Sequence, residues 1–390
     1  MEIIEELSQR LKKLGELGLK HELDIIFVYF DEYNMADAHY FTNIWTQFER
    51  GFATFTVSTG KVCFLVGPET AEFVKVYRPF LESRIISLLL APGAAYPNTN
   101  AEEVSDVVKD LVGRKPKRIG LVGSGSIPFY LYESLNFLAT EIVDISSDVQ
   151  RARQIKSNGE INDIKKAYQI ADEGLKALLN KLSPGLTETA LAGIGEEAMR
   201  AAGAEGYGIS TILTSGRHTN SIFGRPSSQQ LNDSLIMIGI SPRFNGYCAS
   251  LGIPATIGKV SAESLAFVKN MLDIYHTIEA VLEAGKMASE IYEISREELA
   301  RYKLEKFQIY GAINSLGLFE SEPPFLSKDP DWELEPGMIL SIDLAVFHPK
   351  LFGIRFKSGY LITQKGVSPL SGFFDTACKI VTKHSSQATL

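Results

Sequence analysis

Two basic residues on one predicted strand carry the most chemical information in this chain. Arg355 and Lys357 alternate within the apolar stretch of residues 354–358. Side chains two residues apart in a strand point to the same face of a sheet, so Arg355 faces inward if Lys357 does. A buried pair of cations needs counter-charges, and Asp343 and Glu322 are the obvious candidates. Such a group is either an inert ion-pair cluster or the floor of an anion site, and both interpretations are open at this stage.

His218 is the candidate acid or base of the chain. It lies in a polar loop at residues 217–220, and an imidazole titrates near neutral pH. The alternative is an exposed loop histidine without a chemical role. Cys248 is a weak candidate for a nucleophile, because the sequence places no histidine to activate it, and a buried strand thiol is expected instead.

The composition is that of an ordinary globular protein. The 390 residues are 45% hydrophobic and 22% charged, with a net charge of −8, and this length predicts two or three domains. The acidic balance disfavours nucleic acid as a partner. No apolar run approaches the roughly 20 residues that cross a bilayer, and the N-terminus shows no secretion signal. Together with three widely spaced cysteines, which are expected to be reduced, this predicts a cytoplasmic protein with no membrane partner.

Alternating strands and helices are predicted in the first 149 residues. A helix is expected near Glu69, and strands are expected at residues 24–29, 51–57, 62–66, 118–122 and 141–145. The turn at residues 123–128 begins like a dinucleotide-binding fingerprint, but Pro128 stands in place of its third glycine. The pattern therefore predicts an α/β domain over residues 1–149.

A second domain is predicted to follow. The composition changes near residues 148–156, and Ser157 with Glu160 forms a capping-box pattern that opens a long helix to about Leu182. This domain is expected to span residues 150–375, with a C-terminal tail at residues 376–390.

Several landmarks together resemble the creatinase, prolidase and aminopeptidase P family of M24-type peptidases. The stretch Arg-x-Ile-Lys-Ser-x-x-Glu-Ile at residues 153–161 is similar to the entry of that family's catalytic domain. Later matches keep the family's order: Ser215-Gly216, Gly246-Tyr247, Gly317-Leu318 with Glu322 and Pro324, and Glu335-Pro336-Gly337-Met338. The resemblance covers nearly the whole chain. It implies an α/β (α+β) fold, with a creatinase-like N-terminal domain and a C-terminal "pita-bread" domain of two related halves around a six-stranded curved sheet.

The resemblance also locates the positions of the family's five metal ligands, and only one of them keeps a carboxylate here. The two ligand aspartates correspond to Gly239 and Ser250, the histidine to Asn314, and the two glutamates to Asp343 and Lys357. The formal ligand charge falls from about −4 to about 0, which disfavours a pair of divalent ions. We therefore expect no metal and no other cofactor.

Creatinase provides a metal-free precedent within the family, but its residues are also replaced. Its histidine corresponds to Phe223, and its two glutamates correspond to Gly252 and Lys357. The proton-shuttling histidine of the metal-dependent members corresponds to Ser321. The remaining candidate catalytic residues are His218, Glu322 and Asp343.

The resemblance places several polar residues at the border of the family's cavity. Candidate ligand-binding residues are Arg217, Arg243, Tyr247, Arg355 and Lys357. Their charge suits a small molecule or short peptide bearing a carboxylate or phosphate. Tyr40 and Trp45 lie in a segment that resembles the one reaching the neighbouring subunit's site, which implies a homodimer; aromatic core packing explains these two residues equally well.

Two classes of function are open on the sequence. The first is a diverged, metal-free hydrolase of the Xaa-Pro peptidase or creatinase type that cleaves a C–N or amide bond. The second is a non-catalytic, peptidase-like protein that binds a ligand or a partner, a pseudoenzyme. The polar residues near the expected cavity favour a small ligand, and the incomplete acid-base set disfavours catalysis.

Overall fold

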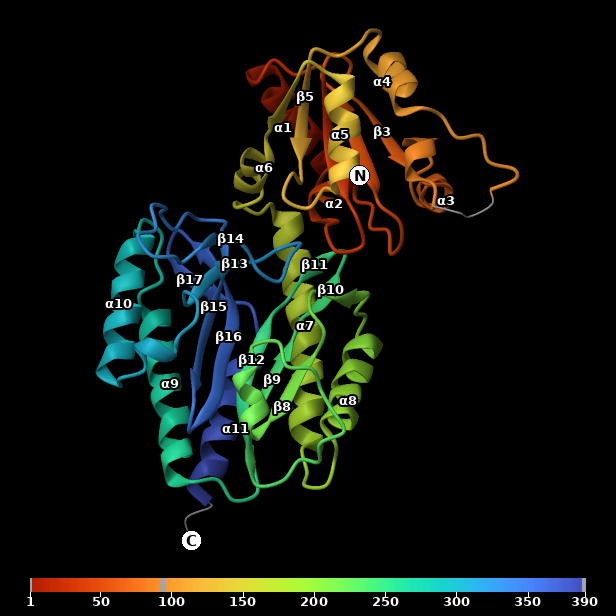
Figure 1. Ribbon diagram of the computed structural model, residues 1–390. Helices are drawn as coiled ribbons and strands as arrows, with labels where there is room; N and C mark the ends of the chain where they lie inside the picture. The colour runs from red at the N-terminus through yellow and green to blue at the C-terminus, as the bar shows by residue number, and fades with distance from the viewer. Residues whose placement is uncertain (1, 92–95, 388–390) are drawn as a thin grey trace. The chain divides into compact units, whose positions relative to one another are not determined.

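The computed structural model describes residues 2–91 and 96–387 (Figure 1). The chain divides into two compact units, Met1–Arg153 and Gln154–Leu390. The predicted boundary after residue 149 lies slightly too early, because helix α6 (Ser146–Ala152) still belongs to the first unit. None of the described helices is long and apolar enough to cross a membrane.

The first unit is built on a six-stranded mixed sheet in the order β4-β3-β2-β1-β5-β6. Strands β1, β5 and β6 run parallel to one another, while β2 is antiparallel to both of its neighbours. The five predicted strands are confirmed to within one residue at each end, and β4 was missed. The strands are β1 (Ile25–Phe30), β2 (Gly51–Thr56), β3 (Lys61–Val66), β4 (Glu82–Ile85), β5 (Arg118–Val122) and β6 (Glu141–Asp144).

Helices cover this sheet because its strands are apolar on both faces, as in the fully buried β1. They are α1 (Glu2–Lys20), α2 (Ala36–Thr42), α3 (Pro68–Tyr77), α4 (Val104–Val112), α5 (Phe129–Leu138) and α6, with a short 3₁₀ turn η1 (Ser87–Leu89). Residues of β1, β3, β5, α4 and α5 form one continuous apolar core.

The second unit contains a large, mainly antiparallel sheet in the order β14-β13-β15-β16-β12-β9-β8, with β17 paired to β16 (Figure 1). It has eight strands rather than the expected six, because β14 and β17 extend it. Its strands are β8 (Ile212–Ser215), β9 (Ser234–Ile240), β12 (Leu251–Ile257), β13 (Ile313–Ser315), β14 (Glu322–Phe325), β15 (Ile339–His348), β16 (Phe352–Thr363) and β17 (Gly366–Pro369). A smaller three-stranded sheet comprises β7 (Gly206–Tyr207), β10 (Pro242–Phe244) and β11 (Tyr247–Cys248).

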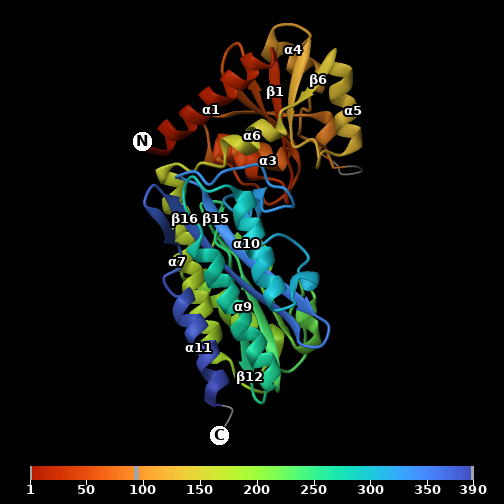
Figure 2. The same ribbon diagram turned by 90° about the vertical axis from the view of Figure 1, so that its left-hand side faces the viewer.

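Two similar helix pairs accompany this sheet, as expected for two related halves (Figure 1). Figure 2 shows the second pair, α9 and α10, from the side. The pairs are α7 (Asn158–Lys181) with α8 (Glu188–Ala201), and α9 (Ala262–Ala280) with α10 (Ala288–Arg301); the 3₁₀ turns η2 (Gly216–Asn220) and η3 (Glu305–Phe307) follow them. Ser157 and Glu160 form the predicted capping box at the start of α7.

The predicted tail at residues 376–390 is largely helical. Helix α11 (Phe374–Gln387) contacts α7, α9 and β12. Ala377, Cys378 and Val381 are buried in it. The C-terminal segment therefore adds to the core of the second unit.

Candidate functional site

One row of paired residues crosses four adjacent strands of the large sheet. Gly239 on β9 pairs with Gly252 on β12, Gly252 pairs with Lys357 on β16, and Lys357 pairs with Asp343 on β15. Gly252 leaves room beside the lysine, since a Cβ atom at Gly252 would lie 3.2 Å from the Cβ of Lys357. The row therefore brings residues distant in sequence to one level of the sheet.

A buried cluster of four charges lies at this level. Arg355 donates two 2.7 Å hydrogen bonds to Asp343, one to each carboxylate oxygen. Lys357 lies 3.1 Å from Asp343 and also hydrogen-bonds Glu320, whose carboxylate is 3.6 Å from Arg355. The side chains of Lys357 and Arg355 are only 1% and 3% exposed. Two cations and two carboxylates thus compensate one another, with a formal charge of zero.

Two hydroxyl groups complete the cluster. Ser250 donates a 2.6 Å hydrogen bond to Glu320, and Tyr310 donates a 3.2 Å hydrogen bond to Asp343. Both carboxylates are therefore held by neutral donors as well as by cations, as buried charges require.

The cluster keeps both carboxyl groups ionised. Burial alone would raise the pKa of Asp343, but Arg355 and Lys357 outweigh burial and hold that pKa well below its usual range. The pKa of Glu320 is lowered in the same way, with burial opposed first by Lys357 and then by Arg355. The pKa of the Tyr310 hydroxyl is raised by burial and by the charge of Asp343. None of these three groups is poised to exchange a proton near neutral pH.

Glu322 belongs to a separate buried ion pair. Its carboxylate lies 3.2 Å from the ammonium of Lys156, which also hydrogen-bonds the Ser315 hydroxyl at 3.1 Å. The expected pairing of Glu322 with Arg355 and Lys357 is wrong, and Glu320 takes that place. The expected pairing of Asp343 with both cations is confirmed.

A cavity of about 370 Å³ opens beside the cluster. Asp343, Arg355 and Glu320 line its polar side, together with Asn314 and Ser321. Its other lining residues include the apolar side chains of Ile222, Phe223, Ile313, Phe325 and Leu326. This volume falls within the range of small-ligand sites.

The remaining predicted site residues do not line this cavity. His218 lies partly buried in η2 and Arg217 is exposed beside it. Arg243 donates to the backbone carbonyls of Tyr207, Gly246 and Leu318, and Tyr247 donates to Glu160. Arg243 and Tyr247 therefore hold the hairpin in place.

Tyr40 and Trp45 lie in the first unit. Arg10 stacks on the ring of the buried Tyr40 at 4.2 Å, and the hydroxyl of Tyr40 donates to the carbonyl of Ala152. Trp45 meets His39 edge to face. These contacts suit local packing, and the role of both residues in a homodimer stays a prediction.

Sequence reasoning missed three residues that the geometry makes prominent: Glu320, Tyr310 and Lys156. Glu320 lies in an irregular bend just before β14, where no strand periodicity reveals its direction. Lys156 is the lysine of the domain-entry motif and pairs with a residue 166 positions away. Neither contact has a local signature in the sequence.

The comparison with protein families decides the relationship. The model of metallopeptidase family M24 matches residues 162–364, about half of the chain. The chain belongs to metallopeptidase family M24. The M24 match lies within the second unit and contains all four members of the charge cluster.

Curated relatives agree with the M24 assignment. The chain is 26% identical over 232 residues to the Xaa-Pro dipeptidase of Pyrococcus furiosus, covering 59% of this chain and 67% of that protein. It is 30% identical over 244 residues to an uncharacterized peptidase of Methanocaldococcus jannaschii, covering 61% and 69%. The predicted family is confirmed.

Solved structures show the same M24 fold. The prolidase from Pyrococcus horikoshii OT3 superposes with a TM-score of 0.80 at 21% identity, covering 93% of this chain and 98% of that one. The X-Pro aminopeptidase from Thermotoga maritima MSB8 gives a TM-score of 0.80 at 21% identity, covering 93% and 97%. The predicted pita-bread fold is therefore confirmed.

The described M24 residues do not fit the metal pair that the family name implies. Within residues 2–91 and 96–387, no group of three or more His, Cys, Asp or Glu side chains is placed to hold a metal ion. The two carboxylates of the cluster are each bonded to a lysine or arginine instead. Further carboxylates would be required at the positions of Gly239, Ser250 and Lys357.

The lowered carboxyl pKa values predict a specific acid sensitivity. A carboxyl group with a folded-state pKa below its unfolded value stabilises the fold above the unfolded pKa, near 4, and loses this contribution as the pH falls toward the folded pKa. The free energy of unfolding of the unmodified chain, measured with urea, is therefore expected to fall steeply as the pH is lowered from about 5 to about 3. Asp343→Asn should be less stable at pH 7 and should show a shallower slope.

The exposed carboxylate Asp331 provides the matched control. Asp331→Asn should keep both the stability and the slope of the unmodified chain. Equal slopes for Asp343→Asn and the unmodified chain would contradict the assignment of Asp343 to the ion-pair cluster.

Proposed function

We propose that this chain is a metal-independent M24 protein that binds a small molecule or short peptide and does not cleave it by metal-activated water. The observation that carries the proposal is the buried, charge-compensated cluster of Glu320, Asp343, Arg355 and Lys357. Two of its members, Asp343 and Lys357, occupy positions at which the family resemblance expects carboxylate ligands.

Electrostatics disfavours a divalent ion in this cluster. An ammonium about 4 Å from a metal ion repels it by about 4 kcal/mol per unit of metal charge at an effective dielectric constant of ~20. The metal would also have to displace the bidentate contact of Arg355 with Asp343. Both costs precede any coordination bond, so the cations hold the site in place of a metal.

The residues near the cavity also lack a competent acid or base. The lowered pKa values of Asp343 and Glu320 make them weak bases, and His218 does not line the cavity. Glu322 is bonded to Lys156 away from the lining. Binding without turnover therefore suits the site better than metal-free hydrolysis.

The cavity favours a ligand with an apolar group. Arg355 and Lys357 are neutralised by their own carboxylates, so the floor offers no net positive charge for an anion. Phe223 and Phe325 are 63% and 47% exposed at residues that line the cavity. A short peptide with an apolar residue could pack against these apolar side chains. Xaa-Pro dipeptides are the first class to test, because one relative is named an Xaa-Pro dipeptidase.

A thermal-shift and calorimetric screen of Xaa-Pro dipeptides, with and without Mn(II), tests the proposal. A dipeptide such as Leu-Pro at ~100 times its dissociation constant should add about 2.7 kcal/mol of stability, equally with and without Mn(II). Phe223→Ala should weaken binding about tenfold because a lining ring is lost, while the exposed Phe137→Ala should not.

Hydrolysis of the same dipeptides is followed by the release of free proline. No release is expected in either condition. Mn(II)-dependent release would overturn the proposal, and metal-independent release would favour the diverged hydrolase. The absence of any bound peptide, with full retention of fold, would favour the peptidase-like interaction protein.

A further inference from the structure

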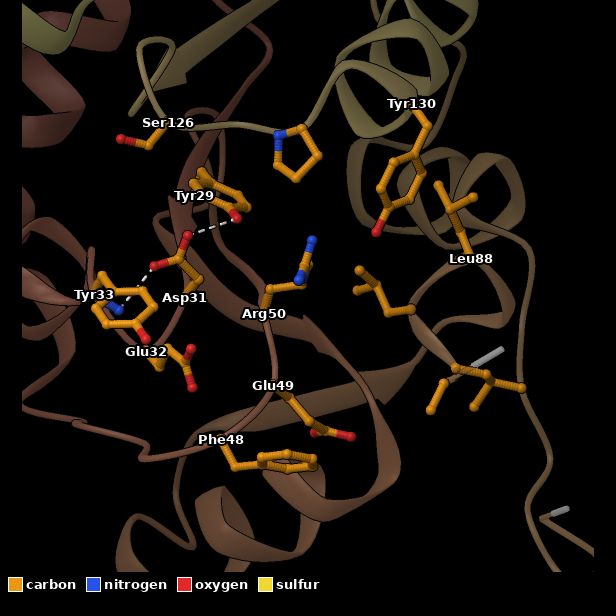
Figure 3. A pocket seen from close by; sticks show the side chains of 14 residues that line it. Tyr29, Asp31, Glu32, Tyr33, Phe48, Glu49, Arg50, Leu88, Ser126 and Tyr130 are labelled. Carbon is orange, nitrogen blue, oxygen red and sulfur yellow. Dashed lines mark hydrogen bonds between the residues drawn. The ribbon is translucent and has the colours of Figure 1, made fainter. Parts of the chain in front are cut away.

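A second cavity lies within the first unit, at the carboxyl ends of two parallel strands (Figure 3). Its volume is about 790 Å³, within the range of ligand sites. The loop after β1 contributes Asp31, the turn after β5 contributes Ser126, and the segment before β2 contributes Arg50. In α/β sheets, ligands bind at this edge because loops from several strands converge there.

Arg50 is the only lysine or arginine among the described lining residues. Figure 3 shows its guanidinium pointing into the cavity between Tyr29 and Tyr130. No hydrogen bond or ion pair joins Arg50 to another residue within the described part of the chain, and residues 92–95, which follow the lining residue Ala91, carry no charge in the sequence. An arginine fork with no carboxylate partner suits a planar anion.

Three carboxylates line the cavity together with Arg50, those of Asp31, Glu32 and Glu49, and each of them has another partner. Asp31 accepts hydrogen bonds from the Tyr29 hydroxyl at 2.9 Å, from the backbone N–H groups of Tyr33 and Asn34, and from the Asn34 side chain. Glu49 accepts a 2.8 Å hydrogen bond from the N–H of Thr70. Glu32 hydrogen-bonds the side chain of Tyr33. Within the described part of the chain, none of these three carboxylates forms an ion pair with Arg50.

Aromatic and aliphatic groups form most of the remaining wall. The rings of Phe48, Tyr33 and Tyr130 line it, and Phe48 and Tyr33 are 64% and 77% exposed. Leu88, Leu89, Leu90 and Pro128 add aliphatic surface. Aromatic side chains that are left this exposed around a cavity offer stacking surfaces to a flat ligand.

We propose that this cavity binds an aromatic carboxylate. Arg50 pairs with the carboxylate, the hydroxyl of Tyr130 donates a further hydrogen bond, and the ring of the ligand packs among Phe48, Tyr33 and the leucines. The carboxylate belongs either to a free aromatic acid or to the C-terminal residue of a peptide. This proposal rests on the first unit alone and is independent of the cavity beside Asp343.

Calorimetric titration of the full chain tests this site with matched ligands. N-acetylphenylalanine is expected to bind, and its neutral amide is expected to bind at least about tenfold more weakly because the charge-assisted hydrogen bonds are lost. Raising the salt concentration should weaken binding of the acid only. Gly-Gly-Phe and its C-terminal amide distinguish the two sources: binding by the tripeptide as tight as by the free acid assigns a peptide C-terminus, and weaker binding assigns a small acid.

Variants separate this site from the other cavity. Arg50→Gln should weaken binding of N-acetylphenylalanine at least about tenfold. The affinity of Arg50→Lys should be intermediate, because lysine keeps the positive charge but lacks the planar guanidinium group. The exposed Arg114→Gln provides the matched loss of one positive charge, and Phe223→Ala alters only the cavity beside Asp343; both should bind the acid normally. Equal binding of the acid and its amide, full retention of binding by Arg50→Gln, or no binding of the acid at 10 mM would overturn the proposal.

Discussion

Replacing Lys357 with methionine is expected to lower the free energy of unfolding by about 3–5 kcal/mol, because it strips one cation from a cluster buried out of water. Asp343 and Glu320 would then share Arg355 alone, and Glu320 would lose its closest cation. The apolar stem of methionine fills the space of the lysine stem, so the change isolates the charge. Urea unfolding at pH 7 measures it.

Two variants make this test selective. Lys365→Met removes an exposed lysine from the turn that follows β16 and should change stability by less than about 0.5 kcal/mol. Lys357→Met combined with Glu320→Gln removes one charge of each sign and should recover more than half of the loss, since Asp343 keeps its bidentate arginine. A double variant as unstable as the sum of its two single variants would show that the two charges do not interact.

Introducing carboxylates at positions 239, 250 and 357 should convert the cluster into a site that binds Mn(II). The triple variant Gly239→Asp, Ser250→Asp and Lys357→Glu would place three more carboxylates beside Asp343 and Glu320. Without metal it should be strongly destabilised by like-charge repulsion. Mn(II) at ~100 times its dissociation constant should raise the free energy of unfolding of this variant by about 2.7 kcal/mol. Calorimetry and thermal unfolding with Mn(II) measure binding and rescue.

The double variant that retains Lys357 is the matched control. With Gly239→Asp and Ser250→Asp alone, the ammonium still faces the site and Mn(II) should bind weakly or not at all. The aspartate at position 239 also requires Ile212 to move slightly, since a Cβ atom there would lie 3.2 Å from the Cβ of Ile212. Unmodified protein that purifies with stoichiometric Mn or Zn would refute the metal-free proposal.

The sequence predicted five of the six strands of the first unit's sheet and three of the four charged members of the cluster. The short apolar run of β5 and the two-residue spacing of Arg355 and Lys357 were sufficient signals, because both are local in the sequence. The capping box at Ser157 was equally local. Family landmarks then identified Asp343 as a partner of both cations.

The fourth charged member, Glu320, depends on pairing between distant segments. Glu320 and Glu322 are two residues apart, but an irregular bend before β14 sends them to different ion pairs. The resemblance to the family motif points to Glu322, whereas Glu320 is the residue that pairs with Lys357. The position of Tyr310 depends in the same way on how its loop packs against β15. The periodicity of the sequence does not indicate this packing.

The row of paired residues that contains Lys357 limits what a single substitution can achieve there. Gly252 leaves space beside the lysine stem, so the residue at position 252 and the residue at position 357 constrain one another. An aspartate at position 239 or 250 alone would leave the ammonium of Lys357 in place, which repels a metal ion, and a glutamate at position 357 alone would leave three carboxylates that share Arg355. Neither single substitution therefore provides a favourable site for a metal ion. Under the metal-free proposal, a metal centre at this level of the sheet would require several substitutions together.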